Sequence, residues 1–326
     1  MKVLITGGAG FLGAHLADAF LARGDNVICM DTGSIAKIQH NFGHPDFTFV
    51  HDTVLNEAMV DALAGQCDLV YHLAAVVGVE HYVADPYAVL NVNINGVQTV
   101  LRAAYKHGKK VVFSSTSEVY GRNPRVPWSE DDDRVLGSTR IDRWCYSTSK
   151  AAGEHFCFAY RKLGLPVVVL RYFNVYGPRL DALDRGRVIT IFLGKAFRNE
   201  PITVVGDGSQ TRCFTYVADA IRATVEAGLR DEAVGEIINI GSSVETTIRD
   251  LAEMVVRLSG SKSEITFVPQ ETVYGSSYED VPRRVPDTTA MERILKVKVE
   301  TPLEEGLKLT IDYFRGLAGG ITTPTP

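Results

Sequence analysis

Short apolar runs rich in β-branched residues alternate with stretches of helical periodicity over the first two thirds of the chain. The apolar runs predict seven strands, at Lys2–Thr6, Asn26–Met30, Phe47–Val50, Leu69–His72, Lys110–Ser114, Val167–Arg171 and Glu236–Ile240. Most are apolar along their whole length, which is typical of parallel strands covered on both faces. The helices predicted between them include Phe11–Arg23, Glu57–Ala64, Pro86–His107 and Tyr146–Leu163. This alternation predicts right-handed βαβ units and therefore an α/β fold with a doubly wound parallel sheet.

The pattern changes after Phe173, where shorter elements are separated by glycine-containing turns. We therefore expect residues 1–174 and about 206–241 to form the parallel-sheet domain. A smaller α/β lobe, which would bind the substrate, is expected from about 175–205 together with 242–316. The last residues, 317–326, are rich in Gly, Thr and Pro, a composition typical of a disordered tail.

Composition narrows the classes of function. With 326 residues, 45% of them hydrophobic, the chain can bury a full core, which excludes a disordered or disulfide-stapled mini-protein. The net charge is −5 and Lys and Arg form no run, so neither nucleic acid nor a membrane is an expected partner. The five cysteines show no metal-site spacing, so we expect buried free thiols and no metal. No apolar stretch approaches the ~20 residues of a membrane span, and the N-terminus predicts a strand, so we expect a cytoplasmic protein.

A glycine-rich turn follows the first predicted strand and opens the first predicted helix, with the sequence Gly7-Gly8-Ala9-Gly10-Phe11-Leu12-Gly13. Gly7 permits a tight turn, Gly10 lets the backbone approach a pyrophosphate, and Gly13 lets the helix pack on the strand. Asp31 ends the second strand, where its carboxylate can bind the adenosine ribose hydroxyls. These features predict a Rossmann-type domain. Since no Arg closely follows Asp31, they favour NAD over NADP, although Lys37 is near.

The ends of the third and fourth strands supply further candidates for cofactor contacts. Asp52 could accept a hydrogen bond from the adenine amine, or it could only cap the start of a helix. The small residues after His72 would let the backbone lie against the dinucleotide, whereas His72 itself is expected to be a packed strand-end histidine. The cofactor contacts that we expect are Gly7, Gly10, Phe11, Leu12, Gly13, Asp31, Asp52, Leu73, Ala74, Ala75, Tyr146 and Lys150.

Tyr146 and Lys150 are four residues apart and therefore share one face of a predicted helix. A phenol with a pKa near ~10 is a poor base, but a lysine ammonium and a positive nicotinamide ring beside it favour the phenolate. Thr116, Ser117 and Glu118 follow the fifth strand, at the sheet edge where ligands bind. Thr116 can share a substrate proton with Tyr146. The structural alternatives are backbone capping for Thr116 and Ser117 and a solvated turn carboxylate for Glu118.

Together these motifs resemble the extended short-chain dehydrogenase/reductase superfamily, in its NAD-dependent nucleotide-sugar epimerase, dehydratase and decarboxylase group. The resemblance extends from Lys2 to about Arg315 and includes the runs 171–179, 206–212 and 239–241. It implies that the C4 hydroxyl of a nucleotide sugar is oxidised while Tyr146 takes its proton. It also implies the substrate ligands Tyr82, Thr116, Asn174, Arg179, Arg212, Tyr278 and Arg284.

Within this group, the run Thr116-Ser117-Glu118-Val119-Tyr120-Gly121 and the position of Arg284 resemble UDP-glucuronate decarboxylases, or UDP-xylose synthases. Residues 177–181 and 274–281 are more similar to the decarboxylase of the bacterial lipid A aminoarabinose pathway. The resemblance implies that Glu118 and Arg284 manage the sugar carboxylate and the protonation of C5, with Ser117 as a candidate acid. We therefore expect NAD-dependent decarboxylation of UDP-glucuronate through a 4-keto intermediate, giving UDP-xylose or the UDP-4-keto-pentose.

Three other functions are weighed against this prediction. A 4-epimerase acting on UDP-glucuronate or UDP-glucose is the main alternative, although Glu118 would then have no chemical task. A 4,6-dehydratase is disfavoured, because Ser117 stands where that reaction needs an acid. A non-catalytic NAD-sensing protein is disfavoured, because Tyr146 and Lys150 are both present.

The resemblance also implies an assembly. Members of the superfamily pair two long helices across a two-fold axis, and the helices Pro86–His107 and Tyr146–Leu163 would do so here. We therefore expect a homodimer. The alternative is that the apolar residues of these helices only cover the sheet.

Overall fold

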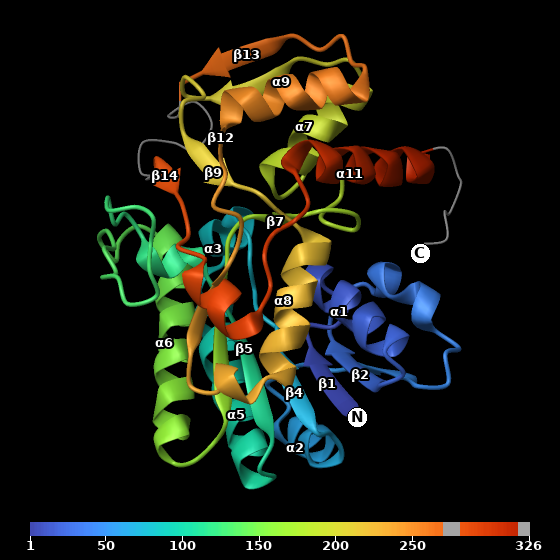
Figure 1. Cartoon of the computed structure of the whole chain (residues 1–326), viewed down its shortest axis with the longest axis vertical. Coiled ribbons are helices and arrows are strands. Elements are labelled where there is room, and N and C mark those ends of the chain that lie inside the picture. The colour runs from blue at the N-terminus through green and yellow to red at the C-terminus, as the bar shows by residue number, and fades with distance from the viewer. Residues whose placement is uncertain (270–280, 319–326) are drawn as a thin grey trace.

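The computed structural model describes residues 1–269 and 281–318, and its centre is a seven-stranded parallel sheet (Figure 1). The strand order is β11-β6-β5-β4-β1-β2-β3, so the chain reverses direction across the sheet between β1 and β4. The strands are β1 (Lys2–Thr6), β2 (Asn26–Asp31), β3 (Phe47–His51), β4 (Leu69–His72), β5 (Lys110–Thr116), β6 (Val167–Tyr172) and β11 (Ile237–Ile240). The predicted doubly wound fold is confirmed, and each of the seven predicted strands is present.

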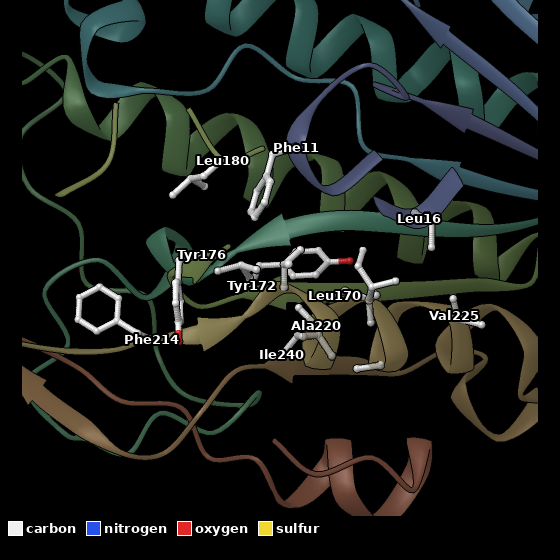
Figure 2. Packing of buried hydrophobic residues seen from close by; sticks show 14 of the residues in the cluster. Phe11, Leu16, Leu170, Tyr172, Tyr176, Leu180, Phe214, Ala220, Val225 and Ile240 are labelled. Atoms are coloured by element: carbon white, nitrogen blue, oxygen red, sulfur yellow. The ribbon is translucent and has the colours of Figure 1, made fainter. Parts of the chain in front are cut away.

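Helices cover both faces of this sheet, and the side chains of single strands divide between two cores. Val3 and Ile5 of β1 face the core beneath α1 (Phe11–Ala22) and α8 (Val217–Leu229), shown in part in Figure 2. Leu4 faces the core beneath α2, α5 and α6. These helices span Glu57–Gln66, Gly96–Lys106 and Arg143–Lys162. Apolar residues at successive strand positions are therefore needed, because both faces are buried.

The helix predicted over Pro86–His107 is interrupted. It consists of α4 (Pro86–Leu90), a wider π-helical turn over Asn91–Asn95, and α5. Inside that turn the buried Asn93 side chain accepts from the backbone N–H of Val76 at 2.8 Å and donates to Ser149 Oγ at 3.1 Å. These bonds connect the turn to α6 and to the loop before α3 (Val79–Ala84). Such π-helical turns are frequent at functional sites.

Three small sheets and three helices complete the described fold. β8 (Ile202–Val205) pairs with β13 (Ile265–Val268), and β7 (Val175–Tyr176) pairs with β10 (Thr215–Tyr216). β9 (Thr211–Cys213) lies between β12 (Glu245–Thr247) and β14 (Arg283–Arg284). The helices are α7 (Val188–Phe197), α9 (Ile248–Ser259) and α11 (Leu303–Ala318). Single helical turns lie at Ile35–Lys37, Gln39–Asn41, Ser117–Tyr120, Asp231–Ala233 and Met291–Leu295.

Two boundaries differ in detail from the sequence-based expectation. β9 lies in the stretch assigned to the sheet domain, yet both of its partner strands lie in the stretch assigned to the lobe. The division into domains otherwise stays a prediction. Residues 317 and 318, expected in the tail, end α11 instead, and residues 319–326 lie outside the described part.

The five cysteines are free thiols, and four of them are buried, as expected; Cys145 is partly exposed. Within residues 1–269 and 281–318, no helix is both long and apolar enough to span a bilayer. The same ranges contain no group of three or more His, Cys, Asp or Glu side chains that could hold a metal ion.

Candidate active site

A cavity of about 1360 Å³ lies along the carboxyl ends of the central strands and continues beneath the small sheets. Its wall contains all but two of the residues expected from the sequence to contact cofactor or substrate or to act in catalysis. The residues placed on it are Gly7, Gly10, Phe11, Leu12, Gly13, Asp31, Asp52, Leu73, Ala74, Ala75, Tyr82, Thr116, Ser117, Glu118, Tyr146, Lys150, Asn174, Arg212 and Arg284. The two exceptions are Arg179, which lies behind the wall, and Tyr278, which lies outside the described residues.

The glycine turn leaves no room for side chains where the cofactor is expected. Gly7 has a φ of 75°, and a Cβ added there would lie 2.6 Å from the backbone N of Ala74. A Cβ on Gly13 would lie 2.2 Å from the carbonyl oxygen of Gly7. The turn therefore exposes backbone to the cavity at the start of α1, where the first N–H groups have no intrahelical acceptor. This cradle fits the pyrophosphate of a dinucleotide.

Asp31 lies at the cavity wall with its carboxylate fixed by the backbone. Its Oδ2 accepts from Ala9 N–H at 2.9 Å and its Oδ1 from Gly33 N–H at 2.8 Å. Lys37 donates through Nζ to the carbonyl of Leu180. Lys37 was the nearby cation that kept NADP possible as the cofactor. Its ammonium is engaged with another segment of the chain, which agrees with an NAD site.

Replacing Asp31 by Ala is expected to weaken NAD binding about tenfold or more, because a hydrogen bond to a charged group contributes ~1.5–3 kcal/mol. Titration with NADH, followed by its fluorescence, measures the change. Asp46→Ala is the matched control, because the Asp46 carbonyl accepts from Val27 at the opposite end of β2. Unchanged affinity in Asp31→Ala would move the ribose contact to another residue.

Asp52 and His72 follow or end strands of the sheet, and each has a structural role. Asp52 lies on the cavity wall, and its carboxylate also accepts from Thr53 N–H and from Asn56 Nδ2, each at 2.7 Å. It therefore organises the turn before α2, and its contact with adenine stays a prediction. His72 is buried and forms a hydrogen bond with Thr6 Oγ1 through Nδ1 at 2.8 Å. It is the packed strand-end histidine that we expected.

Tyr146 projects into the cavity from α6, and its ring stacks on that of Tyr82, with centroids 6.0 Å apart and planes at 19°. Burial raises the pKa of the Tyr146 phenol, and the negative charge of Glu118 raises it further. A hydrogen bond with Thr116 and the charge of Arg187 oppose this shift without outweighing it. The phenol is therefore protonated in the protein alone and needs an additional positive charge nearby to act as a base.

Lys150 lies one helical turn beyond Tyr146 and is also buried on the cavity wall. Its Nζ donates to the carbonyl of Ser114 at 2.7 Å and lies 5.0 Å from the centre of the Phe113 ring. Burial lowers the pKa of Lys150 to about 8, so the side chain is mostly an ammonium at neutral pH. The backbone contact fixes this charge beside the cavity.

Thr116 ends β5 and Ser117 begins the helical turn that follows it; both are buried on the cavity wall. The Oγ1 of Thr116 accepts from Glu118 N–H at 3.2 Å, which is the capping role considered from the sequence. The same hydroxyl is hydrogen bonded to Tyr146. Thr116 therefore combines the structural role with the proposed chemical one.

Glu118 forms the charged centre of the cavity, with its side chain only 16% exposed. Its carboxylate contacts Arg284 of β14 and lies 3.3 Å from the guanidinium of Arg143 at the start of α6. Burial alone would raise the pKa of Glu118, but the charges of Arg284 and Arg143 outweigh it and lower the pKa to about 2. Glu118 is therefore a buried anion and not a solvated turn carboxylate.

Three arginines on the cavity wall were not singled out from the sequence: Arg143, Arg187 and Arg283, the neighbour of Arg284. Arg143 lies three residues before Tyr146, so the helical spacing could have placed it on the same face of α6. Arg187 lies with its guanidinium 5.9 Å from the Phe11 ring centre and 3.1 Å from Asp181. No local pattern marks Arg187, because the segment that carries it reaches the cavity only through the tertiary fold.

Two more of the predicted substrate ligands lie on the wall, one just after β6 and one on β9. Asn174 has a φ of 36° and donates weakly to the carbonyl of Cys213 at 3.5 Å. Arg212 donates to the carbonyl of Thr211 at 2.8 Å and pairs in register with Arg284 across β9 and β14. Such amide and guanidinium groups suit the polar edges and phosphates of a nucleotide.

The structure corrects the expected position of Arg179. Its guanidinium points away from the cavity and pairs with Asp18 of α1 at 2.6 Å. The Arg179 side chain is only 8% exposed and that of Asp18 is 30% exposed, so the arginine is buried and its partner lies near the surface. We therefore no longer include Arg179 among the substrate ligands.

Known proteins are similar to this chain in sequence and in fold. The family described as NAD dependent epimerase/dehydratase matches residues 3–241. The chain is 41% identical over 318 residues to the UDP-N-acetyl-alpha-D-glucosaminuronate decarboxylase of Bacillus cytotoxicus, covering 96% of this chain and 98% of that protein. It is 36% identical to UDP-glucuronic acid decarboxylase 1 of Danio rerio, covering 96% of this chain and 72% of the relative. The solved structure of UDP-glucuronic acid 4-epimerase from Bacillus cereus, in complex with UDP-glucuronic acid and NAD, has a TM-score of 0.87 at 32% identity and covers 97% of this chain and 100% of its own.

Proposed function

Since this chain belongs to the NAD dependent epimerase/dehydratase family, we propose that it decarboxylates a UDP-linked hexuronic acid after oxidation at C4. UDP-glucuronate is the substrate expected from the sequence, and the product is UDP-xylose or the UDP-4-keto-pentose. The names of the bacterial and zebrafish relatives support decarboxylation and differ in the substituent at C2 of the sugar. The 4-epimerase is the alternative, supported by the structural neighbour from Bacillus cereus.

The observation that carries the proposal is the balance of charge around Glu118. Two arginines, Arg143 and Arg284, face one carboxylate, so this group of three has a net charge of +1. All three line the cavity, beside the Tyr146 phenol. Guanidinium groups form strong charge-assisted hydrogen bonds with anions, so Arg143 and Arg284 can bind an anionic group of a ligand in this cavity. The C5 carboxylate of a hexuronic acid supplies that anion, whereas a neutral hexose does not.

The residues near Tyr146 would prepare the sugar for this reaction. The glycine turn and Asp31 would hold NAD, which would supply a hydride acceptor for C4 of the sugar and a positive charge in the site. That charge favours the phenolate of Tyr146, which takes the proton of the C4 hydroxyl. Thr116, which is hydrogen bonded to Tyr146, would orient the C4 hydroxyl of the sugar. The Lys150 ammonium would bind the ribose hydroxyls next to the nicotinamide.

Loss of CO2 then follows from the chemistry of the oxidised sugar. A ketone at C4 is β to the C5 carboxylate, so the bond between C5 and the carboxyl carbon breaks and its electron pair passes into an enolate. Arg143 and Arg284 would orient the sugar carboxylate. The fixed negative charge of Glu118 would repel that carboxylate and so favour its loss as neutral CO2. With a pKa of about 2, Glu118 is a poor proton donor at neutral pH, so the structure favours Ser117 or water as the donor to C5.

Mass spectrometry of the products tests this proposal. The enzyme is incubated with NAD and either UDP-glucuronate or UDP-N-acetylglucosaminuronate, because the relatives differ in this respect. A product lighter by one CO2 is expected from at least one of them. Accumulation of NADH would show release of the 4-keto product, and its absence would show reduction. An isomer of unchanged mass would instead establish the 4-epimerase.

We also propose that the enzyme is a cytoplasmic homodimer. Large apolar side chains remain exposed on the two long helices and at their ends, with Tyr105 46% and Leu163 61% exposed. A two-fold pairing of α5 and α6 would cover them. The free thiols support a reducing compartment. Light scattering should give twice the mass of the chain, and fractionation of the native cells should recover the enzyme with cytoplasmic markers.

A further inference from the structure

A cluster of charged and polar side chains behind the cavity wall joins the chain around Arg179 to the cofactor half of the fold. Arg179 donates through one terminal nitrogen to Asp18 Oδ2 at 2.6 Å and to His15 Nδ1 at 2.8 Å. Its other terminal nitrogen donates to the carbonyl of Lys37 at 2.9 Å. Asp18 and His15 lie on α1, and Lys37 lies in the loop that follows β2. Arg179 therefore connects three separate segments.

The same segments are also connected in the opposite direction. His15 forms a hydrogen bond through Nε2 with the carbonyl of Pro178 at 2.9 Å, and Lys37 donates to the carbonyl of Leu180. Since His15 accepts from Arg179 at Nδ1, it must donate from Nε2 and is neutral. Burial and the charge of Arg179 lower the pKa of His15 to about 4, which agrees with this tautomer. The charges of Arg179 and Asp18 cancel one another, and the Lys37 ammonium is engaged with the Leu180 carbonyl.

Residues on both sides of this cluster line the cavity. On the cofactor side these are Phe11 and Leu12 at the start of α1. On the other side is the segment 178–187, which contributes Leu180 and Arg187 among others. Leu180 and Phe11 belong to one buried hydrophobic cluster, and Figure 2 shows them on the same side of it. The segment 178–187 is therefore a part of the cavity wall that rests on the cofactor half.

The backbone of this segment needs contacts to keep its conformation. Arg179 has a φ of 62° and Asp184 a φ of 67°. Both lie in the left-handed region of backbone conformation, which residues other than glycine adopt rarely. Such a conformation persists only where the surrounding contacts fix it. The Arg179–Asp18 ion pair is the most deeply buried of the charged contacts that the structure gives this segment.

We infer that Arg179 is a positioning residue, whose ion pair with Asp18 fixes the segment 178–187 in its binding conformation before any ligand arrives. NAD and the UDP-sugar then each meet a wall that is already in place. The inference rests on the proposed function only for the identity of the UDP ligand. In the wild-type protein the two ligands should consequently bind almost independently of one another.

Without the pair, the segment would occupy its binding conformation only part of the time. The first ligand to bind would then have to order the segment. Its apparent Kd would equal the intrinsic Kd divided by the fraction of protein in the binding conformation. The second ligand would find the segment ordered and bind with nearly wild-type affinity. Loss of Arg179 should therefore create positive coupling between NAD and UDP.

Calorimetric titration of Arg179→Gln with UDP and with NAD tests the inference. We expect the Kd of UDP alone to rise about tenfold, and to return to within about threefold of wild type when NAD is saturating. NAD should show the reciprocal recovery with saturating UDP, as linkage requires. Arg185→Gln is the matched control, because Arg185 has the same charge, lies on the same segment and is exposed. It should bind both ligands as the wild type does.

Two results would overturn the inference. Wild-type affinities in Arg179→Gln would show that the segment needs no such pair. Weakened binding that the second ligand does not restore would show a direct contact with ligand or general damage to the fold. Should Arg179→Gln not fold, Asp18→Asn removes the charge with little change of shape and must show the same recovery. A wild-type protein that binds NAD but not UDP would count against the proposed function, and the Kd of NAD alone would still test Arg179.

Discussion

Tyr146→Phe is expected to lower kcat between about a hundredfold and ten-thousandfold, because general base catalysis contributes about 10²–10⁴-fold and this phenol is the base of the proposed reaction. The substitution removes one oxygen atom and keeps the ring that stacks on Tyr82. NAD should therefore bind within about twofold of wild type, since the ring still fills the same space. Rates of CO2 release and NADH fluorescence titrations measure the two quantities.

The control for this variant is Tyr160→Phe, which removes a hydroxyl from the same helix far from the cavity. Its turnover should equal that of the wild type. Turnover by Tyr146→Phe at the wild-type rate would exclude Tyr146 as the base. Loss of NAD binding along with turnover would instead indicate that the hydroxyl has a role in cofactor binding.

Glu118→Gln is expected to lower kcat about a hundredfold or more, the usual effect of removing one fixed electrostatic group from an active site. The hydrogen-bonding shape is kept, but the charge of the group with Arg143 and Arg284 rises from +1 to +2. The UDP-hexuronate should bind as tightly as before or more tightly, because its carboxylate no longer competes with Glu118. A fall in kcat without a rise in KM would therefore support a role in the chemistry.

Glu245→Gln provides the matched control for this substitution. Glu245 pairs at 2.5 Å with Arg283, the residue before Arg284 on β14, but its carboxylate does not line the cavity. Glu245→Gln should break the pair between a carboxylate and an arginine of β14 and leave kcat unchanged. If Glu118→Gln lowered substrate affinity and turnover equally, Glu118 would be a binding or structural residue only.

The pH dependence of kcat/KM distinguishes Glu118 from Lys150. The pKa of Glu118 is lowered to about 2, so its charge is present above that pH and lost only as the pH falls through it. The pKa of Lys150 is lowered to about 8, so its ammonium is present below that pH and lost above it. We expect no inflection from Glu118 between pH 5 and 9 and one near pH 8 from Lys150, in wild type and Glu118→Gln alike. A profile that lost its pH 8 inflection in Glu118→Gln would contradict this assignment.

The parts of the site that the sequence predicted are those encoded over short distances along the chain. The glycine turn is marked by a strand, three glycines and a helix, and the structure shows that a Cβ at Gly7 or Gly13 would clash with the backbone. Tyr146 and Lys150 are placed on one face by the helical repeat. The seven strands are marked by apolar residues at successive positions, because β1 buries Leu4 on one face and Ile5 on the other.

The tertiary structure alone decided which charges meet. Glu118 and Arg284 are 166 residues apart, and Arg284 reaches the cavity only because β14 pairs with β9. Arg179 lies in a run that suggested a substrate ligand, yet the fold turns it toward Asp18, 161 residues away. Local spacing fixes turns, helix faces and strand burial, because these depend on neighbouring residues. The partner of a buried charge depends on how distant segments pack, and no local pattern in one sequence carries that information.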